Sequence, residues 1–87
     1  MEIGQPELTG LLERCAEAHH QAYIASGGVD PEWPAWYGAW LQTHLGDRLG
    51  GEMLSRSELA YRLIRAERAT PAGEPWPAAY AVDLLSG

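Results

Sequence analysis

The stretch "WPAWYGA" at residues 33–39 returns 43 positions later as "WPAAYAV" at residues 76–82, and an acid–proline pair precedes each copy. In both copies the proline suits the first turn of a helix, where the N–H that it lacks would have no partner within the helix. We expect each tryptophan to pack back on its own helix and each tyrosine, about one turn later, to face the core. The repeat therefore predicts two helical hairpins with pseudo-twofold character.

The rest of the chain has the period of amphipathic helices. Apolar residues recur at three- and four-residue steps, and no stretch alternates with period two for long enough to form a strand. We expect an all-α fold in which residues 1–87 form a single domain, a bundle of four helices. The expected helices cover residues 6–26, 33–46, 56–69 and 77–86.

The clearest local signal marks the start of the third expected helix. Ser55 is placed to cap it, and Glu58, three positions later, completes a capping box. Leu54 and Leu59 have the spacing of a hydrophobic staple across the same turn. Three arginines further along form a face that we interpret as solvated, with an anion-binding patch as the alternative: Arg62, Arg65 and Arg68.

Composition excludes several classes of partner. The chain has a formal net charge of −6, its six basic residues are all arginine, and it contains one cysteine. An acidic chain is repelled by phosphate backbones and by anionic lipid, so we expect neither nucleic acid nor a membrane as partner. A lone cysteine forms no intrachain disulfide. No apolar run approaches the roughly 18 residues of a membrane helix and no leader is recognisable, so we expect a cytoplasmic protein.

Histidines and aromatic residues gather around the expected joint between the first two helices. These side chains are either the lining of a ligand site or the packing of a joint whose buried polar groups are satisfied, and the second interpretation is favoured. The candidate ligand-binding residues are His19, His20, Tyr23, Trp36, Tyr37, Trp40 and His44.

Antiparallel packing across this joint predicts which side chains meet. Tyr23 is expected to approach Trp36 or Tyr37. His19, one turn earlier, is expected to approach Trp40 or the leucine that follows it. An open pocket with a histidine and Tyr23 at its mouth would favour a ligand site, whereas a solid joint would favour an interaction module.

Two short motifs are compatible with chemistry, but neither is favoured. Cys15 and His19 have the i, i+4 spacing of a thiolate–imidazole pair, with His44 expected nearby in one buried polar cluster. Cys15 lies among leucines and acids, whereas a reactive cysteine needs an electropositive, partly open site. Glu17 and His20 have the Glu-x-x-His spacing of di-iron bundles but fall beside the apolar stripe. We expect no catalytic residue, no metal and no cofactor; an enzymatic role stays open, and a non-enzymatic one is favoured.

The aromatic arc of the second helix suggests a partner. Trp33, Trp36, Tyr37 and Trp40 cover a wider arc than one core face requires. We therefore expect Trp36 or Trp40 to be exposed, or covered by another protein, as the anchor of a homodimer. The alternatives are that the arc covers the fourth helix, or that it walls a pocket for a flat or cationic small molecule. The predicted function is a self-associating helical interaction or accessory module, with a small-molecule- or metal-binding protein as the alternative.

One longer pattern resembles a known kind of protein. The run His19-His20-x-Ala22-Tyr23, followed by Gly28, Asp30-Pro31, Trp33-Pro34-x-Trp36-Tyr37 and Leu41, resembles a signature of small uncharacterised bacterial helical proteins. The similarity extends through residues 57–59 to the Trp76-Pro77 segment, which is most of the chain. The resemblance implies a bacterial source and brings no known activity and no catalytic residues.

Overall fold

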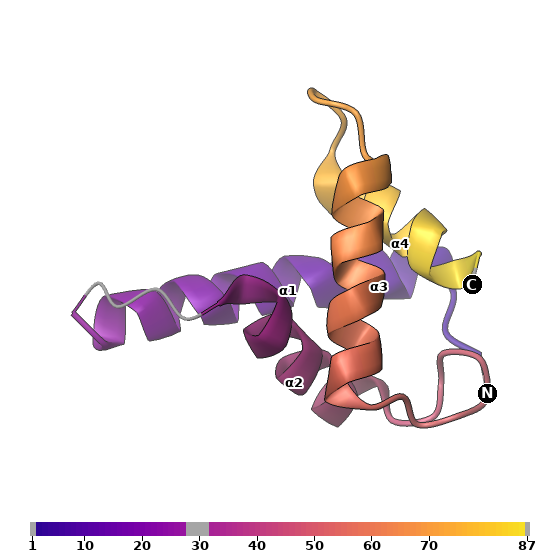
Figure 1. Cartoon of the computed structure of the whole chain (residues 1–87), viewed down its shortest axis with the longest axis horizontal. Helices are drawn as coiled ribbons and strands as arrows, with labels where there is room; N and C mark the ends of the chain where they lie inside the picture. Colours follow the sequence, from indigo (N-terminus) through magenta and orange to yellow (C-terminus); the bar gives the residue numbers. More distant parts are fainter. Residues whose placement is uncertain (1, 28–31, 87) are drawn as a thin grey trace.

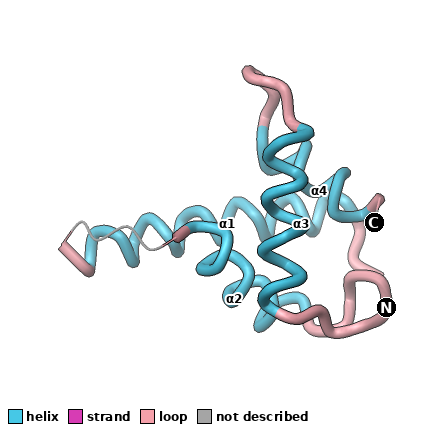
Figure 2. The backbone as a smooth tube through the Cα atoms, in the orientation of Figure 1, coloured by secondary structure: helices cyan, strands magenta, loops and turns pink. Residues whose placement is uncertain are grey.

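The computed structural model describes residues 2–27 and 32–86, and in this part of the chain it contains four helices and no strand (Figures 1 and 2). Each boundary lies within one residue of its expected position, which confirms the all-α, four-helix prediction. The helices are α1 (Gln5–Ala25), α2 (Trp33–Leu45), α3 (Arg56–Ala69) and α4 (Trp76–Leu85).

The helices pack in a pattern that relates the two hairpins to each other. α2 packs most extensively on α3, and α1 packs next most extensively on α4. Exchanging the α1–α2 hairpin with the α3–α4 hairpin converts one of these pairs into the other. The backbones of α2 and α4 stay apart. The arrangement of contacts therefore has the pseudo-twofold character that the repeat predicts.

The core is formed mainly by leucine. Ile3, from the residues before α1, and the two tyrosines of the repeated motif also belong to it. Its buried members are Ile3, Leu8, Leu11, Leu12, Cys15, Tyr37, Leu41, Leu45, Leu49, Leu59, Leu63, Ala66, Tyr80, Ala81 and Leu84.

α1 is longer than the core that it covers. No residue of α1 after Cys15 is buried. Figure 1 shows its C-terminal end reaching out beyond α2 and α3. The first half of α1 therefore contributes buried side chains to the core. The second half has side chains that are half-buried or exposed, so at most one of its sides contacts the rest of the protein.

The start of α3 has the expected cap. The Ser55 hydroxyl accepts a hydrogen bond from the Glu58 N–H at 3.0 Å, which confirms the N-cap. The Glu58 carboxylate accepts from Arg62 Nε at 3.0 Å, one turn further along. Gln42 joins α2 to this point, because its amide nitrogen donates to the Leu54 carbonyl at 3.1 Å.

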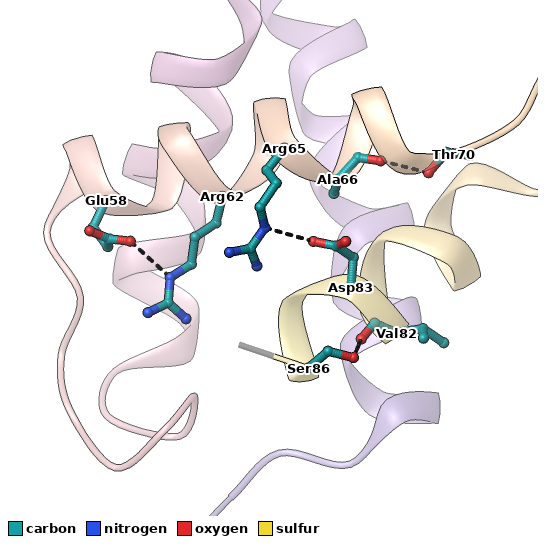
Figure 3. Close-up of polar contacts among 8 residues, drawn as sticks. All are labelled: Glu58, Arg62, Arg65, Ala66, Thr70, Val82, Asp83 and Ser86. Carbon is teal, nitrogen blue, oxygen red and sulfur yellow. Dashed lines mark hydrogen bonds and ion pairs between the residues drawn. The ribbon is translucent and has the colours of Figure 1, made fainter.

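Arg62 and Arg65 do not lie on the fully solvated face that the arginine pattern predicted, because both are half-buried. Arg65 Nε lies 3.2 Å from Asp83 Oδ1 of α4 (Figure 3). The spacing of the arginines does not show that α4 packs beside this part of α3. Arg68 is exposed as expected.

The first residues of the chain are held against the connection between α2 and α3. The Ile3 N–H donates to the Arg48 carbonyl at 2.8 Å, and Glu2 accepts from the Gly50 N–H at 2.9 Å. The Arg48 guanidinium also pairs with Glu7 at 2.7 Å. No helix in the described residues has both the length and the apolar character needed to cross a membrane.

Candidate functional site

The predicted joint forms around His19, but with different partners from those expected. The His19 ring is half-buried and meets Trp36 edge-on at 5.1 Å between ring centroids, and Tyr37 lies 5.5 Å away. The expected partner was Trp40 or the leucine after it. The pairing is shifted by about one turn because α1 extends past the start of α2. Tyr23 consequently lies near the overhanging end of α1 and is 40% exposed.

His44 is not a core residue, so the predicted buried cluster of Cys15, His19 and His44 does not form. The His44 side chain is exposed, its ring stacks on Trp40 at 3.6 Å, and its Nδ1 lies 2.8 Å from the Trp40 carbonyl oxygen. The buried face of α2 carries Tyr37, Leu41 and Leu45, and His44 lies at the flank of that face.

Trp36 and Trp40 are both half-buried and pack against the core. A histidine ring lies against each of them, so neither is the exposed anchor that the width of the aromatic arc predicted. The large apolar side chains that are exposed lie elsewhere: Tyr23, Ile24, Met53, Tyr61 and Val82.

The polar candidates do not assemble into a catalytic or metal centre. His20 is exposed, and Glu17 accepts a hydrogen bond from Gln21 at 3.0 Å. Within residues 2–27 and 32–86, no group of three or more histidine, cysteine or acidic residues is placed to hold a metal ion. Burial raises the pKa of the Cys15 thiol to about 12, so this thiol stays protonated and does not act as a nucleophile near neutral pH.

An aromatic pocket lies at a different place, where the two copies of the repeated motif meet. It is a cavity of about 220 Å³, partly open to solvent. The first two turns of α2 contribute Trp33 and Tyr37, the first two turns of α4 contribute Trp76 and Tyr80, and α3 contributes Glu67. We refer to these five residues as the aromatic pocket.

The four rings of the aromatic pocket form a cycle with matched distances. Within each copy the tryptophan and tyrosine centroids are close, 5.3 Å for Trp33–Tyr37 and 5.0 Å for Trp76–Tyr80. Between copies they are 6.5 Å apart for Trp33–Tyr80 and 6.2 Å apart for Tyr37–Trp76. Both tyrosines are 8% exposed. The pseudo-twofold axis that relates the two hairpins therefore passes through the pocket. The backbones of α2 and α4 stay apart there, and the aromatic side chains connect the two helices.

The tyrosines of the pocket are neutral over the physiological range. Burial raises the pKa of Tyr37 to about 12, with smaller contributions from Cys15 and Tyr80. Burial also raises the pKa of Tyr80, and the neighbouring Glu67 carboxylate raises it further. Glu67 is exposed at the mouth of the cavity. The carboxylate forms no ion pair with any of the residues that the structure describes.

The sequence predicted a site at the joint between α1 and α2, whereas the aromatic pocket lies between the N-terminal parts of α2 and α4. Of the seven candidates only Tyr37 lines the pocket. Trp33 was expected in the aromatic arc that could form the wall of a pocket, whereas Glu67, Trp76 and Tyr80 were not expected to line one. The repeat was the signal that could have found the pocket, because equivalent residues near a pseudo-twofold axis face one another. Glu67 carried no such signal, because it lies outside both copies of the repeat.

A second hollow, of about 330 Å³, lies between α4 and the connection that precedes it. Small side chains and two acids line it, Glu74 and Asp83. Asp83 is already paired with Arg65. This hollow has no aromatic residue in its lining, and Glu74 is its one charged side chain outside an ion pair of the described residues. The aromatic pocket is therefore the better candidate.

Comparisons of the chain with protein-family models, with curated proteins and with solved structures give no match. The resemblance to small uncharacterised bacterial helical proteins therefore stays a prediction.

Proposed function

We propose that this chain is a small, non-enzymatic binding module that holds part of a ligand in the aromatic pocket. The observation that carries the proposal is the cycle of four rings, two from each hairpin, around a cavity of about 220 Å³. The hollow opens to solvent, so a ligand can reach the rings without a change of fold. The volume is below the roughly 300–1,000 Å³ of pockets for drug-sized ligands, so it suits one head group rather than a whole large metabolite.

The composition of the lining supports binding rather than catalysis. The two tyrosines are held neutral, the tryptophans are donors only, and Glu67 is the one carboxylate in the lining. A single carboxylate without a nearby base or nucleophile does not form a catalytic set. Cytoplasmic residence in a bacterium remains our expectation, and the single cysteine suits a reducing compartment.

Indole N–H resonances provide a direct test. The protein labelled with ¹⁵N is titrated with three probes of the same shape: choline, the neutral 3,3-dimethylbutan-1-ol, and the anionic 3,3-dimethylbutanoate. Saturable shifts of the Trp33 and Trp76 indole signals, with Trp40 unmoved as an internal control, support the proposal. The proposal is rejected if no probe moves these two signals at about 50 mM, a concentration well above a millimolar Kd.

A second candidate function, self-association, is favoured by a different surface. Tyr23 is 40% exposed and Ile24 is 57% exposed, next to each other on the part of α1 that contributes nothing to the core. Neighbouring exposed apolar side chains are typical of contact sites. We propose that this end of α1, in place of Trp36 or Trp40, meets its counterpart in a twofold dimer.

Sedimentation of the parent and of Ile24→Glu at micromolar concentrations tests this second candidate. A parental dimer that the substitution converts into a folded monomer supports it. Val82→Glu is the matched control, because Val82 is also exposed, at 52%, and lies on α4. A parent that sediments as a monomer contradicts the dimer.

A further inference from the structure

We infer that the group held in the aromatic pocket is a methylated or quaternary ammonium cation. This inference rests on the proposed function and adds the chemical class of the ligand. It follows from three properties of the pocket: its aromatic walls, the carboxylate at its mouth, and its small number of hydrogen-bond acceptors.

The walls attract a cation through the faces of their rings. An aromatic ring has a negative face, and a cation within about 6 Å of the ring centroid is attracted to it, most strongly by tryptophan. Neighbouring centroids in this cycle lie between 5.0 and 6.5 Å apart. The four rings therefore pack on one another, and a cation in the open hollow that they line would lie against more than one ring, tryptophan included.

Glu67 supplies a full negative charge that has no cationic partner among the described residues. The carboxylate lines the cavity and is close enough to Tyr80 to influence its titration. The ion pairs of the described chain involve other acids: Glu7, Glu58 and Asp83. The net charge of −6 adds a field of the same sign around the pocket. A cation entering the pocket would complete a pair that the fold leaves open.

The scarcity of acceptors favours a methylated cation over a bare ammonium or a guanidinium. An ammonium presents three N–H donors and a guanidinium five, and each needs an acceptor when it leaves water. Apart from Glu67, the side-chain acceptors of the lining are the two tyrosine hydroxyls. Methyl groups on nitrogen need no hydrogen bond and pack against aromatic rings.

The N-termini of α2 and α4 favour an anion over a cation at the pocket. Trp33 and Trp76 are the first residues of α2 and α4, and a helix N-terminus carries a partial positive charge of about half a unit that favours anions. Pro34 and Pro77 remove one N–H donor from each first turn. The Glu67 carboxylate carries a whole charge directly at the cavity. We therefore expect cations to bind better than anions, and an anionic probe belongs in the test.

The three probes of equal shape separate charge from size. We expect choline to bind the full chain about tenfold more tightly than 3,3-dimethylbutan-1-ol, and 3,3-dimethylbutanoate to bind most weakly. If the neutral alcohol shifts Trp33 and Trp76 as strongly as choline does, the pocket binds ligands but the cation inference is wrong. Tightest binding of the anion overturns it as well. Absence of all binding rejects the proposed function itself.

Two pairs of variants assign the effect to the pocket. Glu67→Gln should weaken choline binding about three- to tenfold and leave the neutral alcohol unchanged, because it removes only the charge. Glu13→Gln, at an exposed position of α1, makes the same change in net charge and should leave both affinities unchanged. Equal losses in the two variants would show a general field effect and contradict the specific role of Glu67.

The second pair concerns the rings. Trp76→Phe should weaken choline binding several-fold, because phenylalanine is the weaker partner for a cation, whereas Trp40→Phe outside the pocket should not. Tyr80→Phe is a second test of the ring faces, for the case that Trp76→Phe perturbs the fold. It keeps a ring face and should retain choline binding. Unchanged choline binding in folded Trp76→Phe would overturn the inference.

Discussion

Gly38 of α2 lies directly against the backbone of Arg56 at the start of α3: a Cβ atom added to Gly38 would stand 2.8 Å from the Arg56 carbonyl oxygen. Backbone atoms in a helix cannot move aside as the end of a flexible side chain can. The closest approach of α2 to α3 therefore requires a residue without a side chain, and this approach sets the position of the first turn of α2 above the core.

Gly38→Ala should destabilise the protein by about 1–3 kcal/mol, because the overpacking exceeds the gain of about 1 kcal/mol in helix propensity. Gly10→Ala in α1 is the matched control. Its added Cβ meets nothing within 4 Å, so it should stabilise the protein by about 0.5–1 kcal/mol. Urea unfolding midpoints distinguish the two. Stabilisation by both alanines would mean that α2 and α3 lie further apart than described.

Ser55→Ala should cost about 0.5–2 kcal/mol, because it removes the acceptor for the Glu58 N–H. Ser57→Ala, two positions later and equally exposed, is the control and should be close to neutral. Denaturant midpoints measured on both variants test the cap. Equal effects at the two positions would argue against it.

Trp33→Ala and Trp76→Ala should cost similar amounts. Full truncation of a buried tryptophan costs about 3–5 kcal/mol, and because both side chains are half-buried we expect about 2–3 kcal/mol for each. The similarity follows from the matched ring distances on the two sides of the pocket. Thermal unfolding of both variants measures it. A large difference between them would show that the two copies of the repeat contribute unequally to the fold.

Stability should fall in alkali. Cys15 and Tyr37 have pKa values of about 12 in the folded protein, above the ordinary values of 9.0 and 10.0 that apply when the chain is unfolded. Both groups are uncharged and fully compatible with the core below pH 9. As pH rises from about 9 towards 12, the unfolded chain ionises first and the free energy of unfolding decreases.

The change is measured by urea unfolding between pH 7 and pH 11. Tyr37→Phe removes one of the groups whose pKa the fold raises, and it should flatten the decline. Tyr61→Phe is the control, since Tyr61 is 61% exposed and its substitution should leave the slope unchanged. A decline that is as steep in Tyr37→Phe as in the parent would contradict the role of this hydroxyl.

Local signals in the sequence were sufficient for the helices. Proline at a first turn, a serine cap and glycine after a helix each act within a few residues, so Pro34, Ser55 and Pro77 could be placed without knowledge of tertiary structure. The three- and four-residue spacing of the apolar residues also indicated amphipathic helices. These features depend on the chain near each residue and not on which helices meet.

The side chains beside the core could not be placed in the same way. His44 lies near the edge of the apolar stripe of α2, and a small rotation of the helix decides whether it faces leucine or water. Arg65 and Glu67 owe their positions to α4, which approaches α3 from a distant part of the sequence. The pocket itself depends on the separation between α2 and α4, a quantity that no local pattern contains.

The ring cycle also has an optical consequence. Aromatic rings held at fixed mutual angles in a chiral frame give a circular dichroism signal in the near ultraviolet, which is lost when fixed packing is lost even if helices remain. Here the Trp33–Tyr80 and Tyr37–Trp76 contacts each join one hairpin to the other. The contribution of these two contacts to the near-ultraviolet spectrum therefore reports on the docking of the two hairpins, separately from the far-ultraviolet signal of the helices within them.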